Sequence, residues 1–463
     1  MKSVLIILTG VLPLALIGCA STNPKAAFGD VNKTVTARTG ESVQWRNDSS
    51  SNELAQALAP LLQTNLTAQS AVTVALLNNR SLQAGFEEIG ISQAELAQAS
   101  RLHNIDLTGS WRFPDQPPSA ADIEYSAAGN LLDLLTLPAR KKIAAGNLEQ
   151  TKQEVADKVL QLAADTQTAF YDLQAQEELV ERLQVMLEVN AAGADFAQRQ
   201  SDAGNINDLE LHNQQAPAIQ SQLDLMQAKA EAQTEREHLN RLLGLEGEQI
   251  HWRIADELPA LPEKELSLTN LESLAVRQRL DLASSRSQAE AIAAALRLKE
   301  HTRFIPGLNL GVDTERMPDG QRVTGPTLGL ELPIFDQGQP AVAKLTAESR
   351  QANDRYAALE VNVRSEVRAA RDALLAARAA AALAQDKLLP LRQKILVETL
   401  RQYNAMQKSS YDLLLAKVQE QMAEQTCILA LRDYWTARVA LERAVGGRLT
   451  GYNNIINSER SQP

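Results

Sequence analysis

The chain has 463 residues, of which 46 are Lys or Arg and 57 are Asp or Glu, so its formal net charge is −11. That acidic balance argues against a nucleic-acid-binding protein, which needs a basic face. Aromatic residues make up 4% of the chain, and its two cysteines exclude a disulfide scaffold. Ala and Leu supply much of the apolar content, which favours long helices over a compact aromatic core.

The first 18 residues are typical of a secretory signal peptide. Lys2 precedes an apolar stretch over 4–17 that is too short for a comfortable membrane span. The stretch ends in Leu16-Ile17-Gly18-Cys19, which resembles the bacterial lipobox, where the cysteine is acylated and becomes the first mature residue. We predict lipidation at Cys19, an outer-membrane address and an extended tether behind it. An ordinary signal peptide with an incidental cysteine is the alternative.

The sequence resembles itself at an offset of 200 to 204 residues. Segment 75–82 is similar to 275–282, and segment 204–211 is similar to 408–415. Such a period is too long for a solenoid and predicts a tandem duplication. The predicted parts are a signal peptide over 1–18, a tether over 19–52, a first repeat over 53–244, a connector over 245–267, a second repeat over 268–447 and a polar tail over 448–463. We expect substitutions in the connector to matter little to function.

Each repeat contains a very long helix whose apolar residues are spaced alternately by three and four. The runs begin at Val155 and Val363, and a 3.5-residue period predicts a left-handed coiled coil. A helix over 139–203 would be roughly 100 Å long, which is too long for a globular core. Pro217 and Pro390 lie inside the helical patterns and predict kinks.

The long helices turn back at two short polar tips, over 202–208 and 406–412. In the first tip we expect Gly204 to end one helix and Asn207 or Asp208 to cap the next. In the second tip the expected cap is Ser409 or Ser410.

Alternating apolar and polar residues predict two β-hairpins, over about 105–128 and 307–332, with an Asp319-Gly320 turn in the second. An apolar and a polar face suit a membrane barrel with a wet lumen. Four strands cannot close a barrel, and open edges cannot lie in lipid. Membrane strands would therefore require several chains to share one barrel. The other interpretation is two soluble hairpins that cap a helical bundle.

Together these features resemble the outer-membrane efflux protein (TolC) family over roughly 53–447. The sharpest local likeness is a strand-to-helix junction in 330–338, carried by Pro333, Phe335, Asp336 and Gly338. We expect Pro333 to end the strand, Asp336 to cap the helical segment after it and Gly338 to permit the turn. The corresponding segment 134–140 keeps only the proline, so its path stays open, with a helix around 131–137 as one possibility.

The resemblance implies a mainly α fold with a small β part, in which a homotrimer forms a twelve-stranded barrel in outer-membrane lipid and a coiled-coil helical barrel across the periplasm. It implies a periplasmic adaptor protein and an inner-membrane pump of the RND type as partners, with no enzymatic activity and no cofactor. It also assigns the tips to adaptor docking or to a periplasmic gate. The tip residues are Asp202, Gly204, Asn205, Asp208, Gln407, Lys408, Ser409 and Asp412. Helix capping is the alternative role for Asp208 and Asp412.

Several features leave alternatives open. The histidines and cysteines show no metal-ligand spacing, and no catalytic constellation emerges. The basic cluster over 140–142 is either a solvated helix start or a contact with lumen charge or lipid headgroups. The competing function is a lipid-anchored periplasmic coiled-coil scaffold without a pore. The cargo is not specified by the sequence.

Overall fold

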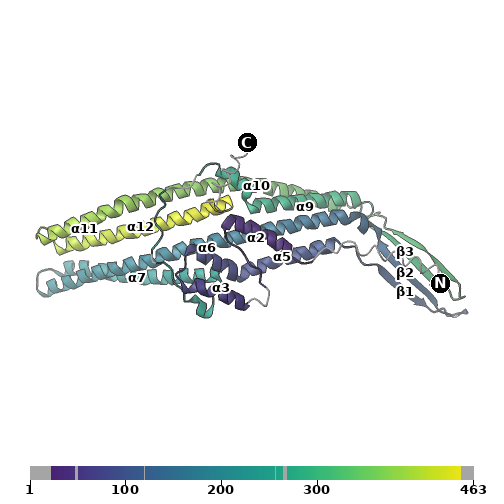
Figure 1. The fold of residues 1–463 in the computed structure, drawn as a ribbon, viewed down its shortest axis with the longest axis horizontal. Coiled ribbons are helices and arrows are strands. Elements are labelled where there is room, and N and C mark those ends of the chain that lie inside the picture. The colour runs from purple at the N-terminus through teal and green to yellow at the C-terminus, as the bar shows by residue number, and fades with distance from the viewer. Residues whose placement is uncertain (1–21, 47–50, 119, 256, 264–267, 450–463) are drawn as a thin grey trace. The chain divides into compact units, whose positions relative to one another are not determined.

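The computed structural model describes residues 22–46, 51–118, 120–255, 257–263 and 268–449 (Figure 1). The predicted signal peptide and the lipidation site at Cys19 lie outside the described residues. In chain order the elements are α2 (Lys25–Thr39), α3 (Ser51–Gln63), α4 (Ala68–Asn78), α5 (Arg80–Ala99), β1 (Asp106–Arg112), β2 (Asp122–Asn130), α6 (Leu131–Asp202), α7 (Asp208–Leu243), the 3₁₀ turn η3 (Gly247–Ile250), α8 (Leu271–Gln278), α9 (Leu280–Thr302), β3 (Leu308–Arg316), β4 (Arg322–Leu330), α10 (Gln339–Leu383), the π-helical turn η4 (Ala384–Leu388), α11 (Leu389–Asn404) and α12 (Ser410–Val445).

The same order of elements occurs twice. Each repeat contains a helix pair that is broken at one extended residue. This residue is Asn79 (φ −64°, ψ 119°) in the first repeat and Arg279 (φ −61°, ψ 128°) in the second. The N–H groups of these residues donate to the carbonyl oxygens of Ala75 and Ala275. This repeated backbone geometry supports the predicted duplication.

α6 is one continuous helix of 72 residues, as expected for the very long helix of the first repeat. It begins directly after β2, so 131–137 is helical and Pro138 lies inside the helix. The Asn130 side chain accepts a hydrogen bond from the Leu132 N–H at 2.9 Å. That bond satisfies one of the N–H groups that every helix start leaves unpaired.

The matching helix of the second repeat is interrupted. α10 and α11 are separated by the π-helical turn η4. Pro390 has no N–H to donate to the Asp386 carbonyl. The N–H of Leu389 donates to the carbonyl of Ala384, five residues earlier instead of the usual four. The helix is therefore irregular at the proline where the sequence predicts a kink. Pro217 lies within α7, which is one unbroken helix.

The four strands form one antiparallel sheet in the order β1-β2-β3-β4 (Figure 1). β2 and β3 pair across the two repeats, from Ile123↔Arg316 to Asn130↔Asn309. The predicted hairpin turn is present, since Gly320 has φ +90° and its N–H donates to the Met317 carbonyl at 2.9 Å. β4 ends at Leu330, before the predicted end at residue 332. Pro333 has no N–H for a strand ladder, which limits the strand here.

α2 lies where an extended tether was predicted. Val31 and Val35 on this helix are 1% and 0% exposed. Apolar residues four positions apart lie on one side of a helix, so burying them favours helix over extended chain. The prediction of an extended segment is therefore wrong for 25–39.

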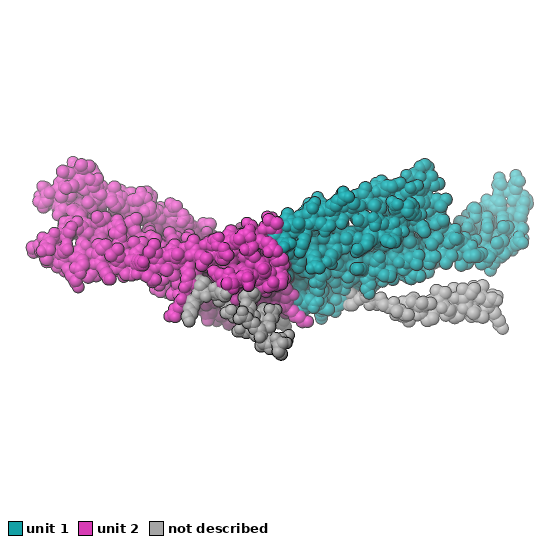
Figure 2. All heavy atoms as spheres, turned by 90° about the horizontal axis from the view of Figure 1, so that it is seen from above, with its two compact units in different colours: residues 1–31, 85–155, 280–360 teal, residues 32–84, 156–279, 361–463 magenta. Residues whose placement is uncertain are grey.

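The chain divides into two compact units (Figure 2). Unit 1 contains residues 1–31, 85–155 and 280–360, with all four strands, and unit 2 contains residues 32–84, 156–279 and 361–463. The main core of unit 2 is built from Leu58, Leu66, Ala71, Val74, Ala75, Ala169, Phe170, Leu173, Leu239, Leu243, Leu245, Trp252 and Ile254. None of the helices in the described part of the chain combines the length and hydrophobicity needed to cross a bilayer.

The connector between the repeats is fastened to the helices of unit 2. The Gln174 side chain donates to the carbonyls of Ala255 and Glu257 at 3.0 and 2.7 Å. The Trp435 indole donates to the Pro259 carbonyl at 2.8 Å. Because Trp252 of the connector is also 3% exposed, substitutions here should affect stability, whatever their effect on function.

Candidate functional site

One face of the sheet is apolar. Directly paired residues of antiparallel strands point to the same side of a sheet, so Leu107, Ala127, Val312 and Pro326 form one row across the four strands. Leu107 is 81% exposed. Further exposed apolar side chains of this face are Trp111, Tyr125, Leu310, Leu328 and Leu330. An apolar surface of this kind needs a partner or a lipid environment.

The opposite face is polar and acidic. The Arg112 guanidinium lies 2.8 Å from the Glu124 carboxylate, 3.6 Å from Asp122 and 3.7 Å from Glu315. Asp313, paired with Ser126, points to the same side. Carboxylates thus outnumber arginine on this face of the described sheet.

The sheet has two open edges. β1 pairs only with β2, and β4 pairs only with β3, among the described strands. The outward N–H and C=O groups of β1 and β4 are therefore available to strands of another chain.

Two of the four predicted junction residues act together. The Gly338 N–H donates to the Asp336 carboxylate at 2.8 Å, and the Gly338 carbonyl accepts from the Val342 N–H at 3.0 Å to start α10. Asp336 therefore closes a turn and does not cap the helix as expected. Pro333 comes after the end of β4, and the Phe335 side chain is fully exposed.

The position of Gly338 accepts only glycine without strain. Its φ is +77°, and a Cβ there would lie 2.7 Å from the Cβ of Arg303. The sequence identified this glycine from the junction pattern, and the structure supplies the steric reason.

The α6–α7 tip ends α6 with a Schellman motif. Gly204 has φ +75°, its N–H donates to the Ser201 carbonyl at 2.8 Å, and the Asn205 N–H donates to the Gln200 carbonyl at 2.8 Å. The predicted end of the helix at Gly204 is thus present in the structure.

The α11–α12 tip repeats this motif with a different residue. Met406 has φ +55°, its N–H donates to the Tyr403 carbonyl at 2.9 Å, and the Gln407 N–H donates to the Gln402 carbonyl at 2.9 Å. Met406 is 95% exposed. The structural equivalent of Gly204 is therefore Met406, whereas the sequence similarity pairs Gly204 with Lys408.

The helix caps at the tips show the same correspondence. Asn207 caps α7 by accepting from the Glu210 N–H at 2.9 Å, and Ser409 caps α12 in a capping box with Asp412. Asp208 is the first residue of α7, so its alternative role as the cap is wrong. Asp412 acts as the third residue of the box, where it accepts from the Ser409 N–H at 3.0 Å.

The remaining charged tip residues are held near the turns. The Asp202 carboxylate accepts from the Gln198 side chain at 2.9 Å. The Lys408 ammonium lies 3.9 Å from the Asp412 carboxylate. The tip residues named from the sequence thus lie on or beside two turns of similar geometry.

No protein-family model matches the sequence. The chain is 24% identical over 338 residues to the cobalt-zinc-cadmium resistance protein CzcC of Cupriavidus metallidurans, which covers 70% of this chain and 77% of that protein. The Campylobacter jejuni CmeC outer membrane channel has 18% identity and a TM-score of 0.72, over 85% of this chain and 89% of CmeC. The Neisseria gonorrhoeae MtrE outer membrane channel has 17% identity and a TM-score of 0.66, over 82% of this chain and 89% of MtrE.

The chain has the fold of the outer-membrane efflux channels. This confirms the resemblance to the TolC family that the sequence predicts, together with the mainly α fold class.

The sequence analysis missed one contact near the tips of this efflux-channel fold. The Tyr411 hydroxyl donates to the Gln200 side-chain oxygen at 2.9 Å, and the Tyr411 ring lies 5.7 Å from the Phe196 ring. The contact joins α12 to α6. A lone tyrosine one residue inside a helix start gave no signal in the sequence, because its partner lies far away along the chain.

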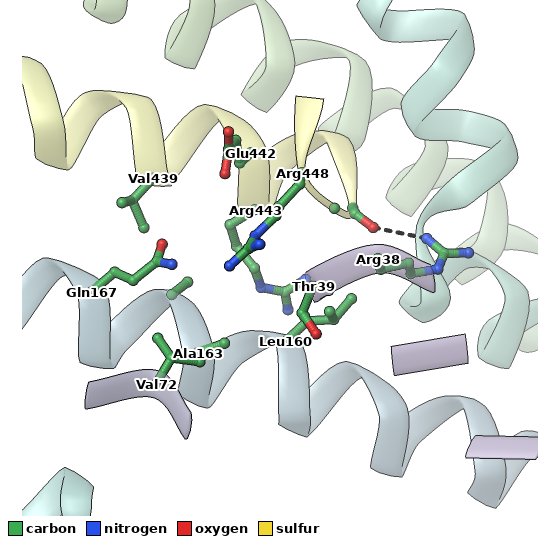
Figure 3. Close-up of a pocket in the computed structure, with 13 residues that line it drawn as sticks. Arg38, Thr39, Val72, Leu160, Ala163, Gln167, Val439, Glu442, Arg443 and Arg448 are labelled. Carbon is green, nitrogen blue, oxygen red and sulfur yellow. Dashed lines mark hydrogen bonds between the residues drawn. The ribbon is translucent and has the colours of Figure 1, made fainter. Parts of the chain in front are cut away.

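A pocket in unit 2 is lined by α2, α6 and the end of α12 (Figure 3). The Arg38 guanidinium donates to the Gly446 carbonyl at 2.8 Å, the bond drawn in Figure 3. Arg443 makes a two-pronged contact with Asp157, with both N···O distances at 2.9 Å. Burial raises the pKa of the Glu442 carboxyl, and the charge of Arg438 opposes that shift. The Arg443–Asp157 pair joins α12 to α6, and the Arg38 bond ties α2 to the residue after α12.

The described residues contain no group of three or more His, Cys, Asp or Glu side chains placed to hold a metal ion. Cys427 is buried, and burial raises the pKa of its thiol. A thiol that resists ionisation is a poor nucleophile and a poor metal ligand.

Proposed function

We propose that this protein is the outer-membrane channel component of a tripartite efflux system, a passive trimeric duct that exports substrates from the periplasm or an inner-membrane pump to the exterior. One observation carries the proposal: a four-stranded sheet with an exposed apolar face, a polar face and two open edges, in a chain with the efflux-channel fold. Backbone groups cannot stay unpaired in lipid. Identical copies must therefore complete the barrel, and three copies supply twelve strands.

The same proposal includes two protein partners and a membrane anchor. The two tips would meet a periplasmic adaptor protein, and an inner-membrane pump of the RND type would supply the energy. The chain would be anchored in the outer membrane by lipid on Cys19, with a large periplasmic part, and it would perform no catalysis.

The alternative is a lipid-anchored periplasmic scaffold without a pore. Its sheet would need some other cover for the exposed Leu107, Leu328 and Leu330 side chains. Exposing them to water costs about 25 cal/mol per Å², so the duct is the better account of this face.

Conductance in planar bilayers, with the mass of the detergent-solubilised particle, tests the duct. We expect a trimer that opens ion-conducting pores. A monomer, or a trimer that inserts without conducting, would contradict the proposal and favour the scaffold.

The gate is tested at Asp202. We expect Asp202→Lys to change single-channel conductance or block by cations, because a ring of three such carboxylates attracts cations. Asp165→Lys is the matched control, since Asp165 also accepts from a glutamine one turn earlier, at 2.7 Å, and lies far from the tips along α6. Equal conductance and block in Asp202→Lys and wild type would remove Asp202 from the gate.

We further propose divalent metal cations as cargo. Support comes from the acidic polar face of the sheet and from the likeness to a protein named for cobalt, zinc and cadmium resistance. Deletion of the gene should raise sensitivity to these metals while leaving sensitivity to dyes and detergents unchanged. The opposite pattern would indicate organic cargo.

A further inference from the structure

Two arginines stand opposite each other on the apolar face of the sheet. Arg316 of β3 pairs directly with Arg322 of β4, at the end of the strands beside the hairpin turn. The adjacent row has the same side-chain direction, since the Thr314 and Thr324 hydroxyls are 2.8 Å apart. Like charges directly across a strand pair are destabilising. Some compensating feature should therefore accompany this pair.

No compensating acid is found within the described residues. Neither arginine has an ion pair there, and both side chains are exposed. The carboxylates at this level, on Asp122, Glu124 and Glu315, point to the opposite face and gather around Arg112. Asp319 of the turn accepts from the Gln321 N–H.

The row that holds the arginines has the composition of a membrane interface. Across the sheet it continues as Arg316, Ile123 and Trp111. The Trp111 ring packs edge-on against Tyr125 of the next row, with centroids 5.7 Å apart. Paired Trp and Tyr rings mark headgroup level in outer-membrane barrels.

The distance to the other end of the sheet agrees with this level. β3 has 9 residues, so it extends roughly 30 Å at about 3.3 Å per residue. Tilted by about 40°, it would rise roughly 23 Å, close to the height of about 25 Å of the apolar band of such barrels. Leu308 and Leu330 form the row at the far end, so the arginines lie at one boundary of the band.

We propose that Arg316 and Arg322 together bind a phosphate group of an anionic membrane lipid. The inference rests on the proposed function, because it requires the apolar face to lie in lipid. Guanidinium groups bind phosphate oxygens in two-pronged fashion. A phosphate between them would turn a repulsive cross-strand pair into a binding site, with the lipid chains lying along the apolar rows below.

Native mass spectrometry of the purified trimer tests the site, with bisphosphorylated lipid A as the probe. We expect the double variant Arg316→Gln/Arg322→Gln to bind it at least tenfold more weakly than wild type, because both charged hydrogen-bond donors to the phosphate are removed. Arg350→Gln/Arg355→Gln is the matched control. It removes two exposed arginines of α10 that have no ion pair among the described residues, and it should bind like wild type.

Inorganic phosphate at millimolar concentration distinguishes a lipid site from a simple anion site. We expect it to leave the bound lipid A in place, and complete displacement would overturn the lipid assignment. Conductance separates the two proposals. Variants that insert and conduct but bind lipid A equally well overturn the site alone, whereas a wild-type protein that never enters bilayers overturns the proposed function and this site with it.

Discussion

The two repeats pass from the sheet to the long helix in different ways. In the first, α6 starts at the residue after β2 and carries Pro138 inside it. In the second, an irregular segment over 331–338 separates β4 from α10, and the turn depends on Gly338. The long helix also differs, because α6 is continuous while its partner contains η4.

Other features are shared between the repeats. The breaks at Asn79 and Arg279 have nearly the same dihedral angles. The returning helices both end at left-handed glycines, Gly244 (φ 67°) and Gly446 (φ 93°). The two repeats therefore share their backbone geometry at the helix breaks and at the ends of the returning helices. They differ where a proline or a glycine changes the backbone hydrogen bonds, at the sheet-to-helix junction and at η4.

The largest expected effect is at the second junction. Gly338→Ala should lower the free energy of unfolding by about 3 kcal/mol, since it combines left-handed strain with a Cβ 2.7 Å from Arg303 Cβ. Gly320→Ala is the control, with φ +90° and nothing within 4 Å of its Cβ, and should cost only about 1 kcal/mol. Thermal unfolding of both variants measures the difference. Equal losses of stability would mean that the Arg303 side chain moves aside without cost.

Gly244 and Gly446, which follow the returning helices, test whether the space around the helix end is equally restricted in the two repeats. A Cβ on Gly244 would lie 2.9 Å from the Asn78 carbonyl oxygen, whereas one on Gly446 would lie 3.3 Å from Arg279 Cα. Gly244→Ala should therefore cost about 3 kcal/mol and Gly446→Ala about 2 kcal/mol. A larger loss for Gly446→Ala in denaturant unfolding would reverse the comparison.

Arg443 and Arg241 occupy equivalent places, each three residues before its glycine cap. The Arg443 and Asp157 side chains are 20% and 22% exposed, and removing one partner of such a pair is costly. Arg443→Met should lower stability by about 2 kcal/mol. Arg241 is exposed, and Arg241→Met should stay within about 0.5 kcal/mol of wild type. Equal melting temperatures for the two variants would remove this asymmetry between the repeats.

One substitution in the α11–α12 tip should increase stability. Met406→Gly should stabilise the turn by about 1 kcal/mol, because an exposed side chain in a left-handed conformation contributes strain and little packing. Gly204→Met should cost about the same. Hydrogen exchange at the two tips measures both, and a loss on Met406→Gly would point to a contact of this side chain that outweighs the strain.

The smallest effect is a dependence on pH. Hydrogen bonds from the Ser409 N–H and hydroxyl hold the pKa of Asp412 below its usual value, so its contribution is present above the ordinary aspartate pKa of about 3.9 and lost as pH falls through the lowered value. The Asn207 cap of the first tip is uncharged. Protection of the α12 start in Asp412→Asn should therefore fall below wild type at pH 7 and match it near pH 2. A deficit that persists at pH 2 would exclude the carboxylate as its cause.

Much of the fold could be predicted from local patterns. The 3.5-residue period gave the long helices, and the Asp319-Gly320 pair gave a hairpin turn, because each depends on residues close together in the chain. Local patterns gave a wrong prediction at α2. The polar composition there indicated an extended tether, although Val31 and Val35 are buried on a helix.

The site was predictable only in part. The sequence predicted where the tips lie. Sequence similarity aligned Gly204 with Lys408, whereas the Schellman geometry aligns Gly204 with Met406. Asp336 was identified, but its predicted role as a helix cap was wrong. Its carboxylate accepts from the Gly338 N–H instead, because the turn at Gly338 brings the two groups together. The bond between Tyr411 and Gln200 had no signal at all, because nothing in either segment specifies the other.

The sequence by itself determined the periods, the caps and the alternation of the strands, since side-chain spacing decides which face of a helix or strand is apolar. The tertiary structure alone decided that β2 pairs with β3, and hence that Arg316 shares a row with Trp111. Register between strands from different repeats is fixed by contacts between distant parts of the chain, and no local pattern records it.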